Sequence, residues 1–308
     1  MITVVGSLNM DLVIESPRLP APGETVLGRH FRRAPGGKGA NQAYAVARMG
    51  MAGAMIGAVG DDAFGAEMVS NLETAGVDAA GVVRRARVAS GVAMIVVDDN
   101  GQNQIVVAGG ANDTLAPADV TRQAALFRRS KAVVAQLETP LDTVATALQL
   151  ARDHKALAVL NPAPLAPGSL ALLRWCDWLI ANENEGSKLS GVEVRDVASA
   201  QKAARAIKDR AACPNILITL GANGVWIDAP SFTGHVPGFT VEAVDTVGAG
   251  DAFIGAFVTR LVEGAEAQEA AQFGCAAAAL AVTRRGAQAS IPARAEVEKV
   301  LERGRIGS

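Results

Sequence analysis

Short apolar runs alternate with longer segments of helical periodicity along most of this chain. The runs are apolar throughout rather than alternating, as expected for strands that helices cover on both faces of a parallel sheet. The predicted strands span 2–5, 54–59, 132–135, 156–160, 178–180 and 216–219. The predicted helices span 40–49, 63–75, 141–153, 198–210, 251–263 and 267–283. This order predicts a layered α/β fold with a mainly parallel sheet, whose ligands bind at the carboxyl ends of the strands.

Two segments depart from this rhythm. Residues 18–33 carry prolines and a glycine, followed by an alternating stretch at 25–28. Residues 88–107 predict two strands, 92–97 and 104–107, around an Asn-Gly turn, which is typical of a β-hairpin. Together they predict a small β-layer over the parallel sheet. Periodicity alone leaves open whether it is a lid or an ordinary pair of surface hairpins.

Composition and charge narrow the class of protein. Half of the 308 residues are hydrophobic, so the chain can bury enough surface to fold. The formal net charge of −2, without a Lys/Arg block, argues against nucleic acid or an anionic membrane as partner. The N-terminus lacks a secretory pattern, and prolines interrupt the longest uncharged stretch, 156–173. With three scattered cysteines, these features predict a cytoplasmic protein with reduced thiols.

A first glycine cluster lies at 35–42. Its three glycines permit close approach of a ligand to the backbone at the start of a helix. The phosphate-loop pattern fails because Gly39 follows Lys38, and the dinucleotide pattern fails because Gln42 replaces its third glycine. Lys38 and Asn41, which are polar residues among glycines, favour ligand binding over a flexible loop with a helix cap.

A second glycine cluster lies at 245–253, where a buried helix is predicted to begin near Gly250. Free backbone N–H groups at that helix start could bind an anion or stabilise charge on a phosphoryl group. Asp251 has an alternative interpretation as a residue that merely complements the helix dipole.

Polar residues also follow the predicted strands. Because carboxyl ends of parallel strands meet at one edge of the sheet, we expect these side chains to lie together. They are Asn9, Asp11, Glu138, Asn182, Glu183, Glu185, Thr219, Gly221 and Gly224.

The motifs GGKGANQA (36–43) and DTVGAGDAF (245–253) resemble the two signatures of the ribokinase-like (PfkB-type) carbohydrate kinases. Further motifs are similar to those of the ribokinases within this family: GSLNMD (6–11), PGET (22–25), GDDAFG (60–65), QLETP (136–140), NPAP (161–164) and TLGANGV (219–225). The resemblance runs from residue 2 to about 292 with the motifs in the family's order. It implies a three-layer α/β/α sandwich in a single domain, 1–308, with a β-sheet lid formed by about 11–33 and 88–108.

The resemblance implies ATP-dependent phosphorylation of D-ribose at its 5-hydroxyl. Asp251 would be the general base, and Gly248, Ala249 and Gly250 would form an anion hole of backbone N–H groups. The sugar would be bound by Asn9, Asp11, Gly37, Lys38, Gly39, Ala40, Asn41, Glu138 and Asp251. The nucleotide would be bound by Asn182, Thr219, Leu220, Gly221, Ala222, Asn223, Gly224, Gly250, Asp251 and Cys275.

The same resemblance implies two metal ions and a partner. Asn182 and Glu185 match an element that helps to place Mg²⁺, often through water. A monovalent cation, usually K⁺, would lie at Asp245, Val247, Ala281, Arg284, Gly286 and Ser290. The lid would pair two subunits into a homodimer. Cys275 departs from the family pattern, since Asn or His is commoner there, and core packing is its simplest interpretation.

Other functions stay open at this point. The protein could be a kinase for another small sugar or nucleoside, such as 2-deoxyribose or fructose. It could also be a catalytically silent sugar- or nucleotide-binding protein, although Asp251, the anion-hole glycines and Glu185 are intact. An NAD-dependent oxidoreductase is disfavoured because both glycine clusters fail its pattern.

Overall fold

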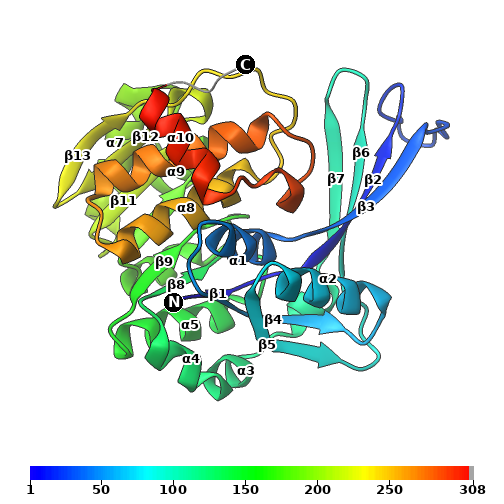
Figure 1. Cartoon of the computed structure of the whole chain (residues 1–308), viewed down its shortest axis with the longest axis horizontal. Helices are drawn as coiled ribbons and strands as arrows, with labels where there is room; N and C mark the ends of the chain where they lie inside the picture. Colours follow the sequence, from blue (N-terminus) through cyan, green and yellow to red (C-terminus); the bar gives the residue numbers. More distant parts are fainter. Residues whose placement is uncertain (305–308) are drawn as a thin grey trace.

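A nine-stranded sheet forms the centre of the molecule in the computed structural model, which describes residues 1–304 (Figure 1). The strand order is β13-β12-β11-β10-β9-β8-β1-β4-β5, and all neighbouring pairs are parallel except β11–β12 and β12–β13. The strands are β1 (Ile2–Val5), β4 (Gly53–Gly60), β5 (Val77–Arg85), β8 (Ala132–Ala135), β9 (Leu157–Leu160), β10 (Trp178–Ala181), β11 (Asn215–Thr219), β12 (Val225–Ala229) and β13 (Phe232–Val236). The predicted mainly parallel sheet is confirmed. Residues 305–308, which the predicted domain includes, lie outside the described residues.

Helices cover both faces of this sheet and make the three-layer sandwich. One layer contains α1 (Lys38–Arg48), α2 (Ala63–Thr74), α8 (Ala249–Glu263) and α9 (Ala267–Val282), with α10 (Arg294–Arg303) packed on α9. The other contains α3 (Pro117–Arg122), α4 (Ala124–Arg129), α5 (Leu141–Asp153), α6 (Glu183–Ser190) and α7 (Val197–Arg210). Short 3₁₀ helices are η1 (Gly110–Thr114), η2 (Ser169–Trp175), η3 (Gly221–Asn223) and η4 (Gln288–Ser290).

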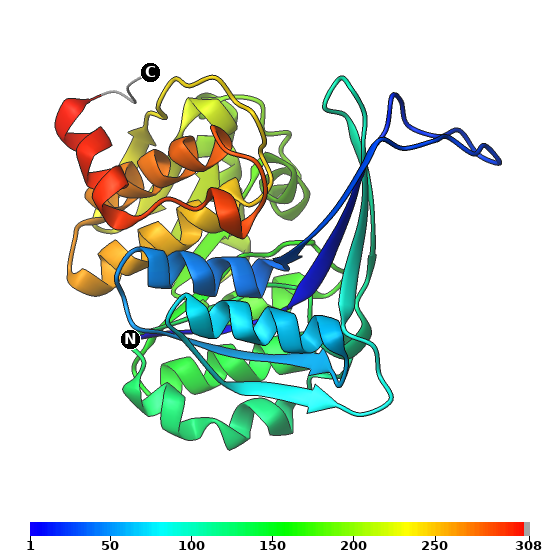
Figure 2. The same ribbon diagram turned by 45° about the vertical axis from the view of Figure 1, so that its right-hand side comes forward.

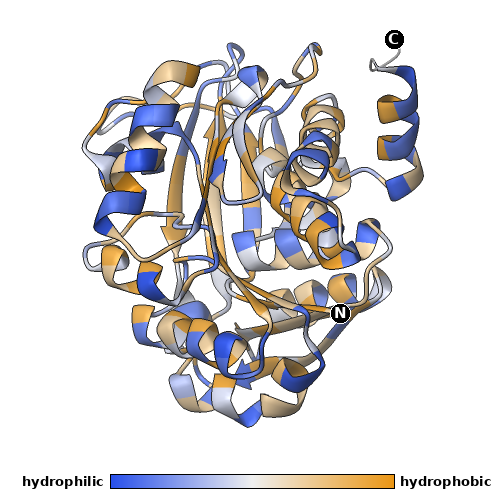
Figure 3. Ribbon diagram, turned by 90° about the vertical axis from the view of Figure 1, so that its left-hand side faces the viewer, coloured by the Kyte–Doolittle hydropathy of each residue, from blue (hydrophilic) through white to orange (hydrophobic). Residues whose placement is uncertain are grey.

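The uniformly apolar strands follow from burial on both faces. In β10, Leu179 packs into the cluster under α5 and α7, whereas Trp178 and Ile180 pack into the cluster under α1 and α8. Because successive side chains of a strand point to opposite faces, every position of such a strand is buried. Figure 3 shows apolar strands inside, and helices that alternate polar and apolar stretches around them. Within residues 1–304, no helix is long and apolar enough to cross a membrane.

A second, four-stranded sheet projects from this body (Figure 2). We call it the lid; its strand order is β3-β2-β6-β7, with β2 and β6 parallel and the outer pairs antiparallel. The strands are β2 (Asn9–Glu15), β3 (His30–Gly36), β6 (Gly91–Val97) and β7 (Asn103–Ala108). The hairpin β6–β7 is confirmed, with Gly101 at φ +77° in its turn.

The predicted β-structure at 25–28 is wrong, because no strand forms between Glu15 and His30. Leu27 is 87% exposed, so the alternating stretch buries no apolar face that would stabilise a strand. Pairing with β2 begins only where Arg29 N donates to Glu15 O at 2.8 Å. Two lid strands therefore span 9–15 and 30–36. The alternating stretch at 25–28 belongs to the connection between them.

Candidate active site

A cavity of about 390 Å³ lies at the carboxyl ends of the parallel strands, beneath the lid. Its lid-side wall is apolar and comes from Ala93, Ile95, Ile105 and Val107. The body contributes polar groups from both glycine clusters and from the ends of several strands. These are Asn9, Asp11, Gly37, Lys38, Asn41, Glu138, Asn161, Asn182, Glu185, Thr219, Gly248, Gly250 and Asp251. Six of the nine residues expected to meet at this sheet edge line the cavity, whereas Glu183, Gly221 and Gly224 do not.

The first glycine cluster packs directly against the chain between β1 and β2. A Cβ on Gly37, which has φ +89°, would approach Asn9 N to 2.7 Å, and one on Gly39 would approach Ser7 N to 2.6 Å. Ala40 N donates to Ser7 O at 2.9 Å, and Lys38 N donates to a Glu138 carboxylate oxygen at 3.2 Å. Glycine is therefore required here for close backbone packing, which places Lys38 at the start of α1 and inside the cavity.

Asp251 lies in the first turn of α8 and is 8% exposed. Asn41 Nδ2 donates to its Oδ2 and Gln42 Nε2 to its Oδ1, both at 2.9 Å. Burial raises the pKa of Asp251, while the charge of Lys38 and the two amides lower it; burial dominates and the pKa is raised. A carboxylate with a raised pKa in a cavity has the properties of a general base.

Backbone N–H groups beside Asp251 are free to bind an anion. Gly248, at φ +78°, is the N-cap of α8, and Ala249 N makes only a 3.3 Å bond to Thr246 O. Over residues 1–304, no hydrogen bond uses the N–H of Gly248 or Gly250. A Cβ on Gly250 would meet no atom within 4 Å, so this helix start faces open space. The geometry suits negative charge that develops at a phosphoryl group.

Lys38 is the cation around which the acidic groups of the cavity gather. Burial lowers the pKa of Lys38, but the charges of Asp251, Glu138 and Glu185 outweigh that effect and raise it. Asp11 has its pKa raised to about 7 by burial and by Glu138 and Asp251, against the opposing charge of Arg32. The cavity thus offers carboxylate acceptors for hydroxyl groups around one positive charge.

Sequence reasoning missed Asn112, a 1% exposed residue of η1 that orients Asn9. Its Oδ1 accepts from Leu8 N at 3.0 Å, and its Nδ2 donates to Leu8 O at 3.0 Å and to Asn9 Oδ1 at 2.8 Å. Because Asn9 Oδ1 is used in this way, Asn9 presents its NH₂ group to other partners. No local sequence pattern marks Asn112, because its partners Leu8 and Asn9 lie 104 and 103 positions away in the sequence.

Comparison with known proteins identifies the family to which this chain belongs. Residues 1–294 match the pfkB family of carbohydrate kinases. The chain belongs to this family. It is 42% identical to a ribokinase of Haemophilus influenzae over 98% of both chains, and 37% identical to a deoxyribokinase of Salmonella typhi over 97% of this chain and 98% of the other. The structure of an Arabidopsis thaliana ribokinase complexed with ribose and ATP is similar at 29% identity, with a TM-score of 0.88 over 98% of both chains.

In this pfkB kinase, Asn182 and Glu185 form a capping box at the start of α6. Asn182 Oδ1 accepts from Glu185 N at 2.9 Å, and both Glu185 carboxylate oxygens accept from Asn182 at 3.0 Å. Burial raises the pKa of Glu185, although Asn182 and Lys38 oppose it. Both residues line the cavity. Residues 1–304 contain no group of three or more acidic, His or Cys side chains that could hold a metal. A single carboxylate fits Mg²⁺ that also binds phosphates and water.

The predicted nucleotide segment follows β11. Thr219 lines the cavity, while 221–223 form the exposed η3 and the side chain of Leu220 is buried in the core. Gly224, at φ +84°, lies so close to β13 that a Cβ would come within 2.1 Å of Val236 O. Cys275 lies on the buried side of α9 and is 6% exposed, and burial raises the pKa of its thiol to about 12. Nucleotide contacts of these residues stay a prediction.

The predicted cation positions lie on two segments, one just before the helix start of Gly248 and the other from the last turn of α9 to η4. The carboxylate of Asp245 joins these segments, accepting from Val247 N at 3.0 Å and from Gly286 N at 2.8 Å. No hydrogen bond among residues 1–304 ends on the main-chain carbonyls of Asp245, Val247, Arg284 and Gly286. The remaining positions are engaged, since Ala281 O accepts from Arg284 N at 3.0 Å and Ser290 Oγ donates to Ala287 O at 2.8 Å. Free carbonyl oxygens are ligands that K⁺ uses.

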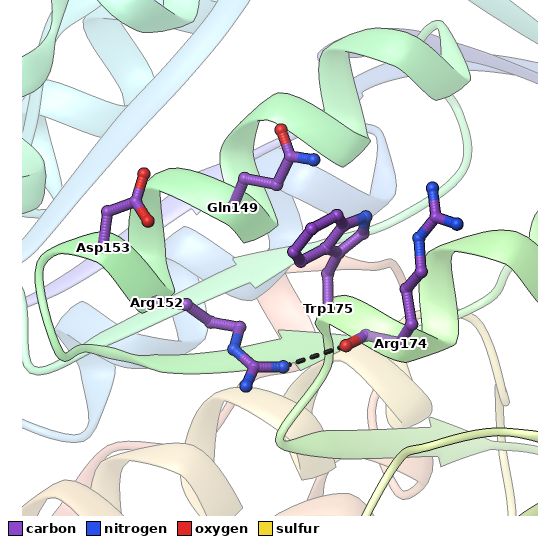
Figure 4. Close-up of a pocket in the computed structure, with 5 residues that line it drawn as sticks. All are labelled: Gln149, Arg152, Asp153, Arg174 and Trp175. Atoms are coloured by element: carbon purple, nitrogen blue, oxygen red, sulfur yellow. Dashed lines mark hydrogen bonds between the residues drawn. The ribbon is translucent and has the colours of Figure 1, made fainter.

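Another hollow, of about 590 Å³, lies between α5 and η2 (Figure 4). It is lined by Gln149, Arg152 and Asp153 of α5 and by Arg174 and Trp175 of η2. Arg152 donates to Arg174 O at 2.9 Å. None of the predicted site residues lines this hollow.

Proposed function

We propose that this protein is an ATP-dependent kinase that phosphorylates D-ribose at the 5-hydroxyl. The observation that carries the proposal is the juxtaposition of Asp251, the free N–H groups of Gly248 and Gly250, and Lys38 in one cavity. Similarity to ribokinases over the full length of the chain supports the choice of substrate.

In the proposed reaction, Asn9, Asp11, Lys38 and Glu138 bind the sugar hydroxyls and orient the 5-hydroxyl toward Asp251. Asp251 accepts the hydroxyl proton as the oxygen bonds to the γ-phosphorus and ADP departs. The N–H groups at the start of α8 stabilise the charge on the transferred phosphoryl group. In reactions of this kind the protein contributes mainly positioning and charge stabilisation.

Two metal ions fit this proposal. Glu185, with one carboxylate in the cavity, would help to hold Mg²⁺ through water, and bound Mg²⁺ neutralises phosphate charge. The free carbonyls of Asp245, Val247, Arg284 and Gly286, with Ala281 and Ser290 nearby, would hold a monovalent cation. A cation there would stiffen the loop that precedes the anion hole.

We expect turnover to be faster in K⁺ than in Na⁺ or Li⁺ at equal ionic strength. The reason is that a large, weakly hydrated ion suits several carbonyl oxygens better than a small, strongly hydrated one. The measurement is kcat under saturating ribose and Mg-ATP in the three chloride salts. Equal rates in all three salts would contradict activation at this site.

We further propose a homodimer formed through the outer face of the lid. Ile14, Phe31, Met94 and Val106 are 38%, 63%, 58% and 70% exposed, and they lie on adjacent strands of that sheet. An exposed apolar face of this kind favours association with a second apolar surface.

Because the reaction consumes ATP, we also propose a cytoplasmic location.

Met94→Asp should convert the dimer to a monomer, since a charge on this face would be desolvated on pairing. Sedimentation velocity at micromolar concentration measures the change. Leu301→Asp, which alters an exposed apolar residue of α10, is the matched control and should leave the dimer intact. A wild-type monomer, or a dimeric Met94→Asp protein, would exclude this interface.

A kinase for 2-deoxyribose is the second candidate, because a deoxyribokinase is 37% identical to this chain. The deciding experiment measures ADP release from Mg-ATP with ribose, 2-deoxyribose, fructose and adenosine. Preference for ribose upholds the proposal, and preference for another acceptor moves the specificity while keeping the mechanism. ATP binding without turnover on any of them favours a silent binding protein.

A further inference from the structure

Gln42 is fully buried on α1 and contacts the carboxylate of Asp251 from behind the cavity. It is 0% exposed and is not among the residues that line the cavity. Its Nε2 donates to Asp251 Oδ1 at 2.9 Å, while Asn41 donates to Oδ2. Each carboxylate oxygen therefore has one amide donor, and the carboxylate cannot rotate without breaking a buried hydrogen bond.

The orientation of the Gln42 amide is fixed by its neighbours. Asn161 Nδ2 donates to Ile180 O at 3.0 Å, and since a carbonyl only accepts, Asn161 Oδ1 faces Gln42. Gln42 Nε2 donates to that oxygen at 3.3 Å, so its NH₂ end faces both Asn161 and Asp251. Gln42 Oε1 then accepts from Gln136 Nε2 at 2.5 Å. The network thus leaves Gln42 one orientation, in which it donates to Asp251.

The other end of this network is the side-chain amide of Gln136. Gln136 Oε1 is buried and has no hydrogen-bond partner within the described part of the chain. Gln136 turns its NH₂ end to Gln42, and this bond supports the orientation in which Gln42 donates to Asp251.

We propose that Gln42 is a positioning residue for Asp251, whose amide holds the carboxylate in a fixed orientation and keeps it unprotonated, ready to accept the proton of the substrate hydroxyl. Amide donors bind a carboxylate more strongly than a protonated carboxyl group. This inference rests on the proposed kinase function, because it assigns Gln42 a role in activating its base.

The charged groups that face Asp251 are Lys38 of α1, Glu138 beyond β8 and Asp11 of the lid. Lys38 favours the ionised form, while Glu138 and Asp11 disfavour it. Gln42 contributes a neutral donor to this balance, so its removal raises the pKa of Asp251 without removing a charged side chain from the cavity.

The test is Gln42→Met, which keeps the length of the side chain and removes the donor. We expect kcat to fall about 10-fold at pH 7, with the KM for ribose changed less than about threefold because Gln42 does not line the cavity. Loss of a hydrogen bond to the ionised form raises the pKa of Asp251. The acid limb of the kcat–pH profile should therefore move to higher pH. Gln136→Met should shift it the same way by less, and Gln149→Met on α5 is the control.

Carboxyl ¹³C NMR titration of Asp251, assigned by difference from Asp251→Asn, gives a readout that does not need turnover. A higher pKa in Gln42→Met upholds the positioning role even if wild-type protein phosphorylates no sugar, in which case only the proposed function fails. An unchanged pKa and an unchanged pH profile in folded Gln42→Met, with active wild type, would overturn the positioning role alone.

Discussion

Asp251→Asn is expected to lower kcat for ribose by at least about 10²-fold at neutral pH, the usual range for loss of a general base. An amide cannot accept the proton of the 5-hydroxyl. The substituted NH₂ group also faces the NH₂ group of either Asn41 or Gln42, which now donate to the carboxylate. Initial rates under saturating ribose and Mg-ATP measure the loss.

A binding measurement and a matched variant distinguish loss of the base from general damage to the site. Calorimetric titration with ribose should still detect binding, since the other hydroxyl partners are unchanged. Asp153→Asn, an exposed acidic residue on α5, is the matched control and should keep wild-type turnover. Near-normal turnover in Asp251→Asn would remove Asp251 from the role of base.

Lys38→Met is expected to lower kcat/KM for ribose by about 10²-fold or more, because it removes the positive charge from a cavity with several carboxylates. Lys38 lowers the pKa of both Asp251 and Glu185. Without it both values rise, and Asp251 is protonated over a wider range of acidic pH. The base is active only when ionised, so the acid limb of activity should move to higher pH.

The measurement is the pH profile of kcat/KM, compared with that of Lys202→Met on the exposed side of α7. The control should overlay the wild type. A Lys38→Met enzyme that loses activity equally at all pH values would show that Lys38 binds substrate without acting on the ionisation of Asp251.

Strands buried on both faces were predictable because burial leaves a local signal. β1, β8 and α5 begin and end at the predicted residues, where apolar runs or helical periodicity stop abruptly. β5 was missed because it is an edge strand whose residues alternate between buried and exposed and end in charged positions. β12 and β13 were missed as well, and their antiparallel pairing at the other edge depends on a turn rather than on a helical crossover.

By itself, the sequence determined which residues would meet at one cavity, because motif spacing and strand ends are local features. Lys38, Glu138 and Asp251 could be named without coordinates, and the parallel sheet explains why they meet. Only the tertiary structure decided how they are held. Gln42 and Asp251 are 209 positions apart, and Asn112 and Leu8 are 104 apart. A buried amide is selected by the geometry of distant partners, and no periodicity along the chain records that geometry.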